Sequence, residues 1–102
     1  MAKVLVINKS CHDFSPAEIY GELVYMSEGV MERFSTTKMF RTFKPFIDES
    51  TAEDLILVTG MTNMSIIVCS MFAFKHGRLN LLLYKEQRQS GRYLKRTVIF
   101  NN

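Results

Sequence analysis

Three short apolar runs, at residues 4–7, 23–26 and 55–58, do most to constrain how this chain can fold. The first run, Val-Leu-Val-Ile, does not alternate with polar residues, which is typical of a strand buried on both faces, as in a parallel sheet. Segments with helical patterns separate the three runs. Strands that alternate with helices predict a mainly parallel α/β sheet with right-handed crossovers.

Two helices are expected between the first and the third of these runs. Ser15 is suited to cap a very short helix that Gly21 would end, and a capping-box glutamate follows Ser15 by three residues. An apolar stripe after Ser35 predicts a longer second helix. Because Pro45 interrupts that stripe, we expect a kink or an early end there.

A third helix is expected over residues 62–75, with Thr62 or a neighbour as its cap and Gly77 as its stop. Its residues are apolar on nearly every side, and a helix without a polar face is usually buried on more than one side. In a chain of 102 residues, we expect the second side to face another subunit. The sequence therefore predicts a homodimer through the 61–76 helix.

A hairpin is expected to complete the sheet, with strands over residues 79–84 and 93–100 joined by a turn at residues 87–91. The length of the chain predicts a single domain over residues 1–102. The fold class that we predict is α/β: a small Rossmann-like, mainly parallel sheet with a C-terminal antiparallel hairpin and helices on both faces.

Charge is divided unevenly along the chain. The first 74 residues carry nine acidic and six basic side chains, whereas the last 28 carry seven basic side chains and one acidic one, Glu86. Such polarity favours a phosphate-bearing or otherwise acidic partner. One alternative is a solvated hairpin whose edge charges keep it unpaired. Another is nucleic-acid binding through the basic 85–96 hairpin, with Tyr84 and Tyr93 available for stacking.

No segment has the pattern of a secretion signal or of a bilayer-spanning helix. Only four consecutive apolar residues occur near the N-terminus, and the longest apolar stretch, at residues 64–74, is interrupted by Ser65 and Ser70. Cys11 and Cys69 do not suggest a disulfide framework. We therefore expect a reduced, cytoplasmic location and no membrane partner.

Polar residues follow each predicted strand, at the edge of the sheet where ligands of open α/β folds bind. The first strand is followed by Asn8, Lys9 and Ser10, the second by Ser27, and the third by residues 59–65. Because these three loops should meet, the sequence predicts a polar ligand site there.

The loop after the third strand has the features of an anion site. Gly60 permits a tight turn and a close approach of the backbone to a ligand, and the free N–H groups of the following helix point outward. Thr59, Thr62 and Asn63 add short hydrogen-bonding side chains. The same residue types also cap helices without any ligand, which is the structural alternative.

A resemblance to a known family appears at these residues. The segment Thr-Gly-Met-Thr-Asn-Met-Ser at residues 59–65 resembles the T-G-G-T-K-x-M-S signature of CRISPR-associated Rossmann-fold (CARF) domains. Met61 stands at the second glycine of that signature and Asn63 at its lysine. The resemblance covers residues 54–85, including the apolar helix and the strand that follow.

The resemblance implies a dimer that binds a cyclic oligoadenylate across its two-fold axis, so that the protein senses, sequesters or cleaves it. If the chain is an enzyme, the resemblance implies a metal-independent phosphodiesterase of the ring-nuclease kind. The ligand contacts that it implies are Thr59, Gly60, Thr62 and Asn63, with Lys9 and Ser10 completing the pocket.

The candidate catalytic residues are Lys9, Ser10 and His12. Lys9 and Ser10 can position a ligand and stabilise charge during attack by a 2′-hydroxyl group. His12 can act as a general base, because the pKa of histidine lies near neutrality. Asp13 follows His12 directly, and neighbours in sequence do not normally face each other, so Asp13 is expected to cap the short helix instead. No cofactor and no metal site is predicted.

Three function classes stay open at this point. The first is a protein that binds a phosphate-bearing nucleotide ligand at the 59–65 turn. The second is a nucleic-acid-binding protein that uses the 85–96 hairpin. The third is a non-catalytic interaction protein that oligomerises through the 61–76 helix. The short chain suits an accessory protein of a virus or a mobile element.

Overall fold

Five strands form one sheet in the order β2-β1-β3-β4-β5 in the computed structural model, which describes residues 2–88 and 90–100. β1 to β4 are parallel, and β5 is antiparallel to β4. The predicted fold class is confirmed. Along the chain the elements are β1 (Lys3–Val6), the 3₁₀-helix η1 (Ser15–Tyr20), β2 (Glu22–Tyr25), α1 (Thr36–Glu49), β3 (Leu55–Leu57), α2 (Thr62–His76), β4 (Arg78–Glu86) and β5 (Gly91–Ile99).

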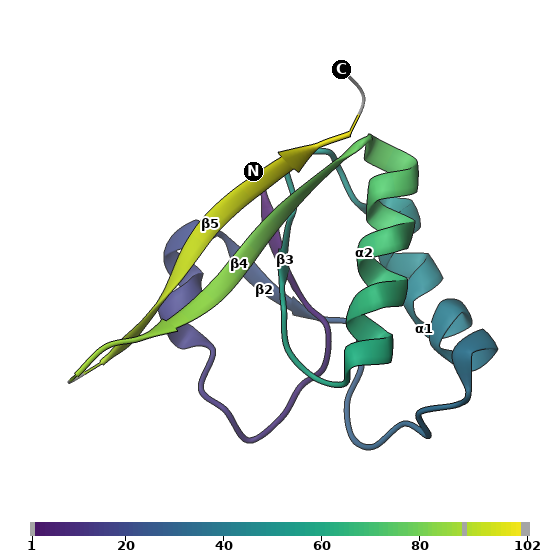
Figure 1. Ribbon diagram of the computed structural model, residues 1–102, viewed down its shortest axis with the longest axis horizontal. Coiled ribbons are helices and arrows are strands. Elements are labelled where there is room, and N and C mark those ends of the chain that lie inside the picture. The colour runs from purple at the N-terminus through teal and green to yellow at the C-terminus, as the bar shows by residue number, and fades with distance from the viewer. Residues whose placement is uncertain (1, 89, 101–102) are drawn as a thin grey trace.

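Both faces of the central strands are buried. On one face, Leu5 and Ile56 pack in a core with residues of α1 and α2. On the other face, Val4, Val6 and Leu57 pack in a second core that includes Ala17 of η1. Figure 1 shows α1 and α2 on one side of the sheet and η1 on the other. This two-sided burial explains why the apolar runs lack alternation.

The order in which the strands are added to the sheet reverses at β1, because β2 lies on one side of it and β3 on the other. The chain passes from β1 to β2 on one side through η1, and then returns through α1 to β3 on the other side of β1. In open α/β sheets such a reversal opens a crevice outside the carboxyl ends of the strands that flank it. The carboxyl ends of β1 and β3 lie at the lower edge of the sheet in Figure 1.

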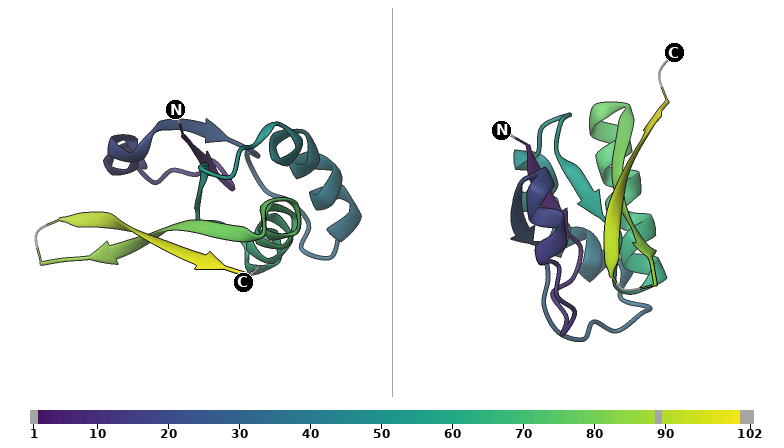
Figure 2. Two further views of the ribbon diagram at one scale, coloured as in Figure 1. Left: turned by 90° about the horizontal axis from the view of Figure 1, so that it is seen from above. Right: turned by 90° about the vertical axis from the view of Figure 1, so that its left-hand side faces the viewer.

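The β4–β5 hairpin extends well beyond the rest of the sheet. Each of its strands has nine residues, but β3 is in register only with Leu81 and Leu82 of β4. The ends of the two strands, residues 83–86 and 91–94, therefore form a two-stranded ribbon that projects from the body (Figures 1 and 2). The hydroxyl group of Tyr20 in η1 donates a hydrogen bond to the carbonyl oxygen of Tyr93, 2.9 Å away, and so anchors the ribbon at its base.

Pro45 does not end α1, so the early end, one of the two outcomes expected there, is wrong. The helix continues to Glu49, with Pro45 inside it. The final turn is held from outside, because the ammonium group of Lys75 donates hydrogen bonds to the carbonyl oxygens of Ile47 (3.0 Å) and Ser50 (3.2 Å). A cation at this end of a helix also complements its dipole, and buried Ile47 fixes the turn to the core.

One helix start differs by one residue from that predicted. Phe14 rather than Ser15 occupies the N-cap position of η1, and Asp13 Oδ1 accepts a hydrogen bond from the backbone N–H of Ser15 at 2.9 Å. Asp13 therefore stabilises the start of η1, as expected. Met61, a neighbour of Thr62, occupies the N-cap position of α2, within the predicted alternatives, and its side chain forms no capping hydrogen bond.

α2 buries only one of its sides within the chain. Met64, Val68 and Phe72 lie in the core, whereas Ile66 and Phe74 are exposed on the outer side. The homodimer through this helix stays a prediction that dynamic light scattering can test. None of the helices that the structure describes is long and apolar enough to cross a membrane.

Candidate functional site

The three predicted loops meet: hydrogen bonds hold the first two together, and Gly60 brings the third into contact with Asn8. Ser27 Oγ lies 2.7 Å from the carbonyl oxygen of Ile7 and 2.9 Å from Asn8 Oδ1. The amide of Asn8 donates a hydrogen bond to the carbonyl oxygen of Gly29 at 3.2 Å. Gly60 has a φ of 88°, and a Cβ there would lie 3.3 Å from Asn8 Cβ. Asn8, Ser27 and Gly60 therefore join the loops to one another.

Two of the candidate catalytic residues also have partners within the chain. The ammonium group of Lys9 lies 3.8 Å from Glu28 Oε2 and 5.4 Å from the centre of the Tyr25 ring. Ser10 Oγ accepts a hydrogen bond from the backbone N–H of His12 at 3.3 Å. The charge that Lys9 would offer to a phosphate is thus partly neutralised by a carboxylate.

The predicted site residues do not share one pocket. Four of them line clefts and divide between two, whereas Asn8, Lys9, Ser10, Ser27 and Gly60 line neither. Thr59 and His12 line the first, which has a volume of about 630 Å³. Thr62 and Asn63 line the second, of about 360 Å³, together with Arg33. The side-chain amide of Asn63 donates a hydrogen bond to the carbonyl oxygen of Arg33 at 2.6 Å, which fastens the loop before α1 to the start of α2. A phosphate-bearing ligand at this turn stays a prediction.

The first cleft lies between the loop before η1 and the projecting ribbon. We call it the tyrosine cleft, because Tyr84 and Tyr93 form its ribbon side. Its side nearest the sheet comes from Val58 and Thr59 at the end of β3. The full lining consists of His12, Asp13, Phe14, Pro16, Val58, Thr59, Tyr84, Glu86, Ser90, Gly91 and Tyr93.

Gly91 fixes the position of the Tyr84 ring. A Cβ on Gly91 would lie only 1.7 Å from the hydroxyl oxygen of Tyr84 and 2.0 Å from the ring carbon that bears it. The Tyr84 ring therefore lies against the backbone at the start of β5, where only glycine leaves room for it. The ring also contacts Tyr93 edge-on, with 5.4 Å between the ring centres. Tyr93 is buried, whereas 57% of Tyr84 is exposed.

The lining of the tyrosine cleft is acidic. It includes Asp13 and Glu86 but no lysine or arginine. Hydrogen bonds from Ser15 lower the pKa of Asp13, so its carboxyl group is ionised at neutral pH. The pKa of Tyr93 is raised, first by burial and then by Tyr84 and the Asp13 carboxylate. The cleft therefore favours groups of positive charge.

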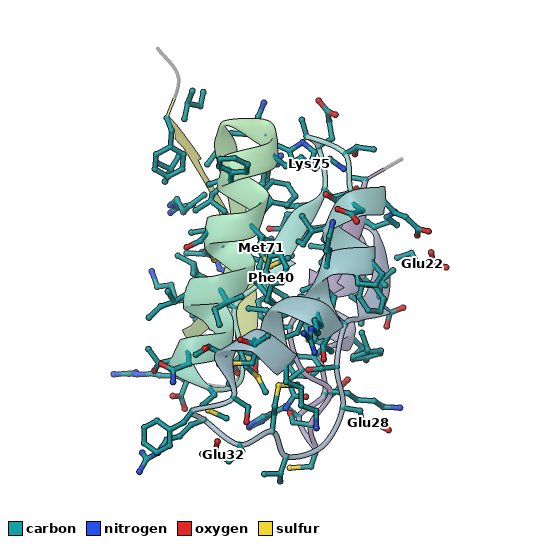
Figure 3. All side chains as sticks on the ribbon, turned by 90° about the vertical axis from the view of Figure 1, so that its right-hand side faces the viewer. Glu22, Glu28, Glu32, Phe40, Met71 and Lys75 are labelled. Atoms are coloured by element: carbon teal, nitrogen blue, oxygen red, sulfur yellow. The ribbon has the colours of Figure 1, made fainter. Side chains whose placement is uncertain are left out.

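A third cleft of about 350 Å³ lies between α1 and α2, on the other face of the sheet. Phe40 and Met71 line it, and Lys75 lies at its rim near the end of α2 (Figure 3). Because Lys75 also bonds to the last carbonyl groups of α1, this groove belongs to the packing of the two helices.

Two of the seven C-terminal basic residues have a structural role. Lys75 stabilises the end of α1, and the guanidinium group of Arg78 donates two hydrogen bonds to Asn80 Oδ1, at 3.2 and 3.1 Å. Among the described residues, no ion pair involves any of the other five. These five exposed residues of the hairpin are Lys85, Arg88, Arg92, Lys95 and Arg96.

Three of these cations share one face of the hairpin. Lys85 and Arg92 are directly opposite each other in the register of β4 and β5, and Arg96 lies four residues after Arg92. Alternate residues of a strand share a face, and Leu79 and Leu81 on this face pack against the core beneath α1 and α2. We call this α2-side surface, made of Lys85, Arg92 and Arg96, the basic face. Tyr84 and Glu86 lie on the opposite face.

The sequence analysis missed the part of the tyrosine cleft that comes from the ribbon. It selected Tyr84 and Tyr93 for stacking on nucleic acid, but Tyr93 is too buried to stack. It gave no role to Glu86 or Gly91 in a pocket. The available signal was Gly91, two residues before Tyr93 in the predicted hairpin. A glycine at such a position leaves room for an aromatic ring from the neighbouring strand, here that of Tyr84.

No group of three His, Cys, Asp or Glu side chains that could hold a metal ion occurs in the described part of the chain. Cys11 is exposed and Cys69 is half-buried, and neither forms a disulfide. Burial raises the pKa of the Cys69 thiol, as for an inert core cysteine.

Comparison with known proteins identifies a family. Residues 3–99 match the family model described as phage Pam3 gp32-like protein. Neither the curated proteins nor the solved structures contain a significant match.

This match corrects the resemblance drawn from the sequence. The matched region includes residues 54–85, on which the similarity to CARF domains rested, so the expected membership of that family is wrong. The physical reason is that a glycine with a positive φ between a buried strand and a helix, here Gly60, recurs in many α/β folds. The prediction of cyclic oligoadenylate binding rested on that resemblance and no longer has its support. The chain belongs to the phage Pam3 gp32-like protein family.

Proposed function

We propose that this protein binds nucleic acid in the cytoplasm through the basic face of its β4–β5 hairpin. The observation that carries the proposal is the position of Lys85 directly opposite Arg92, with Arg96 on the same face. Among the described residues, no acidic side chain forms an ion pair with any of the three.

Like charges that are directly opposite on neighbouring strands destabilise a hairpin. A bound phosphate backbone offsets this repulsion, and it releases counterions from the nucleic acid as well. The two structural cations, Lys75 and Arg78, belong to the body of the protein, so among the described residues from Lys75 onward the unpaired positive charge is concentrated on the hairpin. A surface of this kind supports contacts to phosphates.

The shape of the hairpin favours double-stranded DNA. A two-stranded ribbon fits the major groove of B-DNA, and this ribbon projects from the body (Figure 2) with the cations of its basic face exposed. Base stacking on single strands is less favoured, because Tyr93 is buried and Tyr84 lies on the face opposite the three cations. We therefore expect contacts to phosphates rather than to unstacked bases.

The proposal is tested by the salt dependence of binding to a fluorescently labelled DNA duplex, measured by fluorescence anisotropy. Three phosphate contacts predict that log K falls with log salt concentration with a slope of about −2.7. In the double variant Lys85→Gln/Arg92→Gln, the slope should decrease in magnitude by about 1.8 and binding should weaken at every salt concentration. Labelled single strands serve as the comparison and should bind more weakly.

The matched control is the double variant Lys38→Gln/Arg41→Gln, which removes the same charge from exposed positions on α1. It should keep the slope of the unmodified protein. Absence of binding at low salt would refute the proposal. Equal weakening in both double variants would also refute it, because binding would then follow the net charge of the protein and not the hairpin.

A further inference from the structure

The two faces of the hairpin differ in chemistry. The basic face carries three cations, whereas the tyrosine cleft on the other face has Asp13 and Glu86 in its lining and no lysine or arginine. We propose that the tyrosine cleft binds a guanidinium group on an aliphatic stem, the chemistry of an arginine side chain. This site is separate from the surface that binds nucleic acid.

The aromatic ribbon side of the cleft suits a planar cation. Guanidinium groups stack on the faces of aromatic rings, with electrostatic attraction to the ring as well as contact area. The Tyr84 ring packs against the backbone of Gly91 and contacts the Tyr93 ring, while 57% of Tyr84 stays exposed. These contacts restrict the ring before a ligand binds, which lowers the conformational entropy that binding costs.

The two carboxylates come from opposite sides of the cleft. Asp13 belongs to the loop before η1, and its Oδ1 already accepts a hydrogen bond from Ser15, which holds the side chain in place. Glu86 belongs to the ribbon, at the end of β4. Carboxylates bind guanidinium groups through pairs of charge-assisted hydrogen bonds. The apolar lining residues Phe14, Pro16 and Val58 provide contacts for an aliphatic stem.

Other ligand classes fit the lining less well. A nucleotide would bring phosphate charge toward Asp13 and Glu86 in a cleft whose described lining contains no lysine or arginine. An alkyl ammonium group has the right charge, but it is not planar and cannot form the paired hydrogen bonds that a guanidinium group forms. The predicted order of affinity is therefore guanidinium, then ammonium, then neutral analogues.

The test is a titration of the isotopically labelled full-length protein with L-argininamide, followed by backbone amide chemical shifts in NMR spectra. The matched neutral ligand is L-citrullinamide, in which a ureido group replaces the guanidinium group. We expect saturable shifts at Asp13, Tyr84 and Gly91 with argininamide and none with citrullinamide. A short arginine-containing peptide with blocked ends distinguishes a polypeptide ligand from a free small molecule, because contacts of the flanking residues would tighten binding.

Three variants locate the site. Glu86→Gln and Asp13→Asn remove the charges, and the amide oxygen of the asparagine can still accept the hydrogen bond from Ser15. Each should weaken argininamide binding about tenfold, the effect of losing one charge-assisted contact. Gly91→Ala displaces the Tyr84 ring and should weaken binding while both carboxylates remain. The control Glu49→Gln, at an exposed position on α1, should have no effect.

Failure of this inference can be told apart from failure of the proposed function. Lys85→Gln/Arg92→Gln should leave argininamide binding unchanged, and Glu86→Gln should leave DNA binding intact or strengthen it. Equal shifts with argininamide and citrullinamide, or no saturable shifts in the tyrosine cleft, would overturn the guanidinium site. Full binding in both Glu86→Gln and Asp13→Asn would overturn it as well.

Discussion

Replacing Asn80 with alanine should lower the free energy of unfolding by about 3 kcal/mol. Asn80 is buried at the start of the hairpin, where its side-chain amide donates hydrogen bonds to the carbonyl oxygens of Ala52 (2.7 Å) and Asp54 (2.9 Å). Its Oδ1 accepts hydrogen bonds from Arg78 and Thr97. This one side chain therefore joins the loop before β3 to both strands of the hairpin.

The magnitude follows from the groups that lose a partner. Each buried carbonyl group left without a donor costs about 1–3 kcal/mol, and Asn80→Ala removes this donor from the buried carbonyl group of Asp54 and from the half-buried one of Ala52. Arg78 and Thr97 are accessible enough to bond to water instead, so they add little. For a domain of this size, about 3 kcal/mol corresponds to a decrease in Tm of roughly 12 °C or more.

Urea denaturation followed by circular dichroism measures this loss, with the expectation that the midpoint falls and the slope m is unchanged. The control is Thr97→Val, which removes one of several donors to Asn80 Oδ1 and should cost less than about 1 kcal/mol. A loss below about 1 kcal/mol in Asn80→Ala would refute the reasoning, because water would then have replaced the buried amide. An equal loss in both variants would refute it too.

Three further predictions concern the core, the carboxyl edge and the response to pH. Phe72→Ala should lose about 3–5 kcal/mol in urea denaturation, because Phe72 is fully buried beneath α2; a smaller loss would show that the core collapses around the cavity. Gly60→Ala should lose at least about 1 kcal/mol, because φ is 88° there and a Cβ would crowd Asn8; unchanged stability would contradict that strain. Burial, and then Lys75, lowers the pKa of His76, so the unfolded chain takes up a proton at higher pH than the folded one. Stability should therefore be fully present above a pH of about 6.5 and decrease as the pH falls through the folded pKa. His76→Gln should flatten this decrease in urea midpoints measured across that range, and an unchanged profile would exclude His76 as its source.

Much of the fold could be predicted from the sequence because burial on both faces leaves a direct signature in the central strands. The runs at residues 4–7, 23–26 and 55–58 all form strands, and Gly77 ends α2 in the left-handed conformation as expected. The hairpin was predicted too short at its turn. Its outer residues are exposed and polar, such as Lys85 and Arg92, so no hydrophobic pattern marks them as strand.

The end of α1 could not be predicted, because it depends on a residue distant in sequence. Lys75 bonds to the last carbonyl groups of α1, and that contact exists only once α2 packs beside α1. The local sequence pattern contains Pro45, which predicts an early end, but it does not contain the hydrogen bonds from Lys75 that stabilise the last turn of the helix.

The candidate site was predicted only in part, for a related reason. The sequence located the polar loops, but it could not show that Lys9 pairs with Glu28 or that Asn63 turns toward Arg33. The tyrosine cleft combines a loop, one strand end and a ribbon that are separated by tens of residues. Only the fold brings Asp13 and Glu86 to one cleft.

The hairpin also bears on the order in which the chain folds. β4 and β5 are joined by a short turn, whereas β1 pairs with β3 across about 50 residues of sequence. Closing a long loop is entropically costly and slow, but a hairpin forms within microseconds. We therefore expect β4 and β5 to pair with each other before the other strands of the sheet form. During that interval both edges of the hairpin are open to other chains, and the repulsion among its unpaired cations would slow aggregation. High salt during refolding should then increase the aggregated fraction.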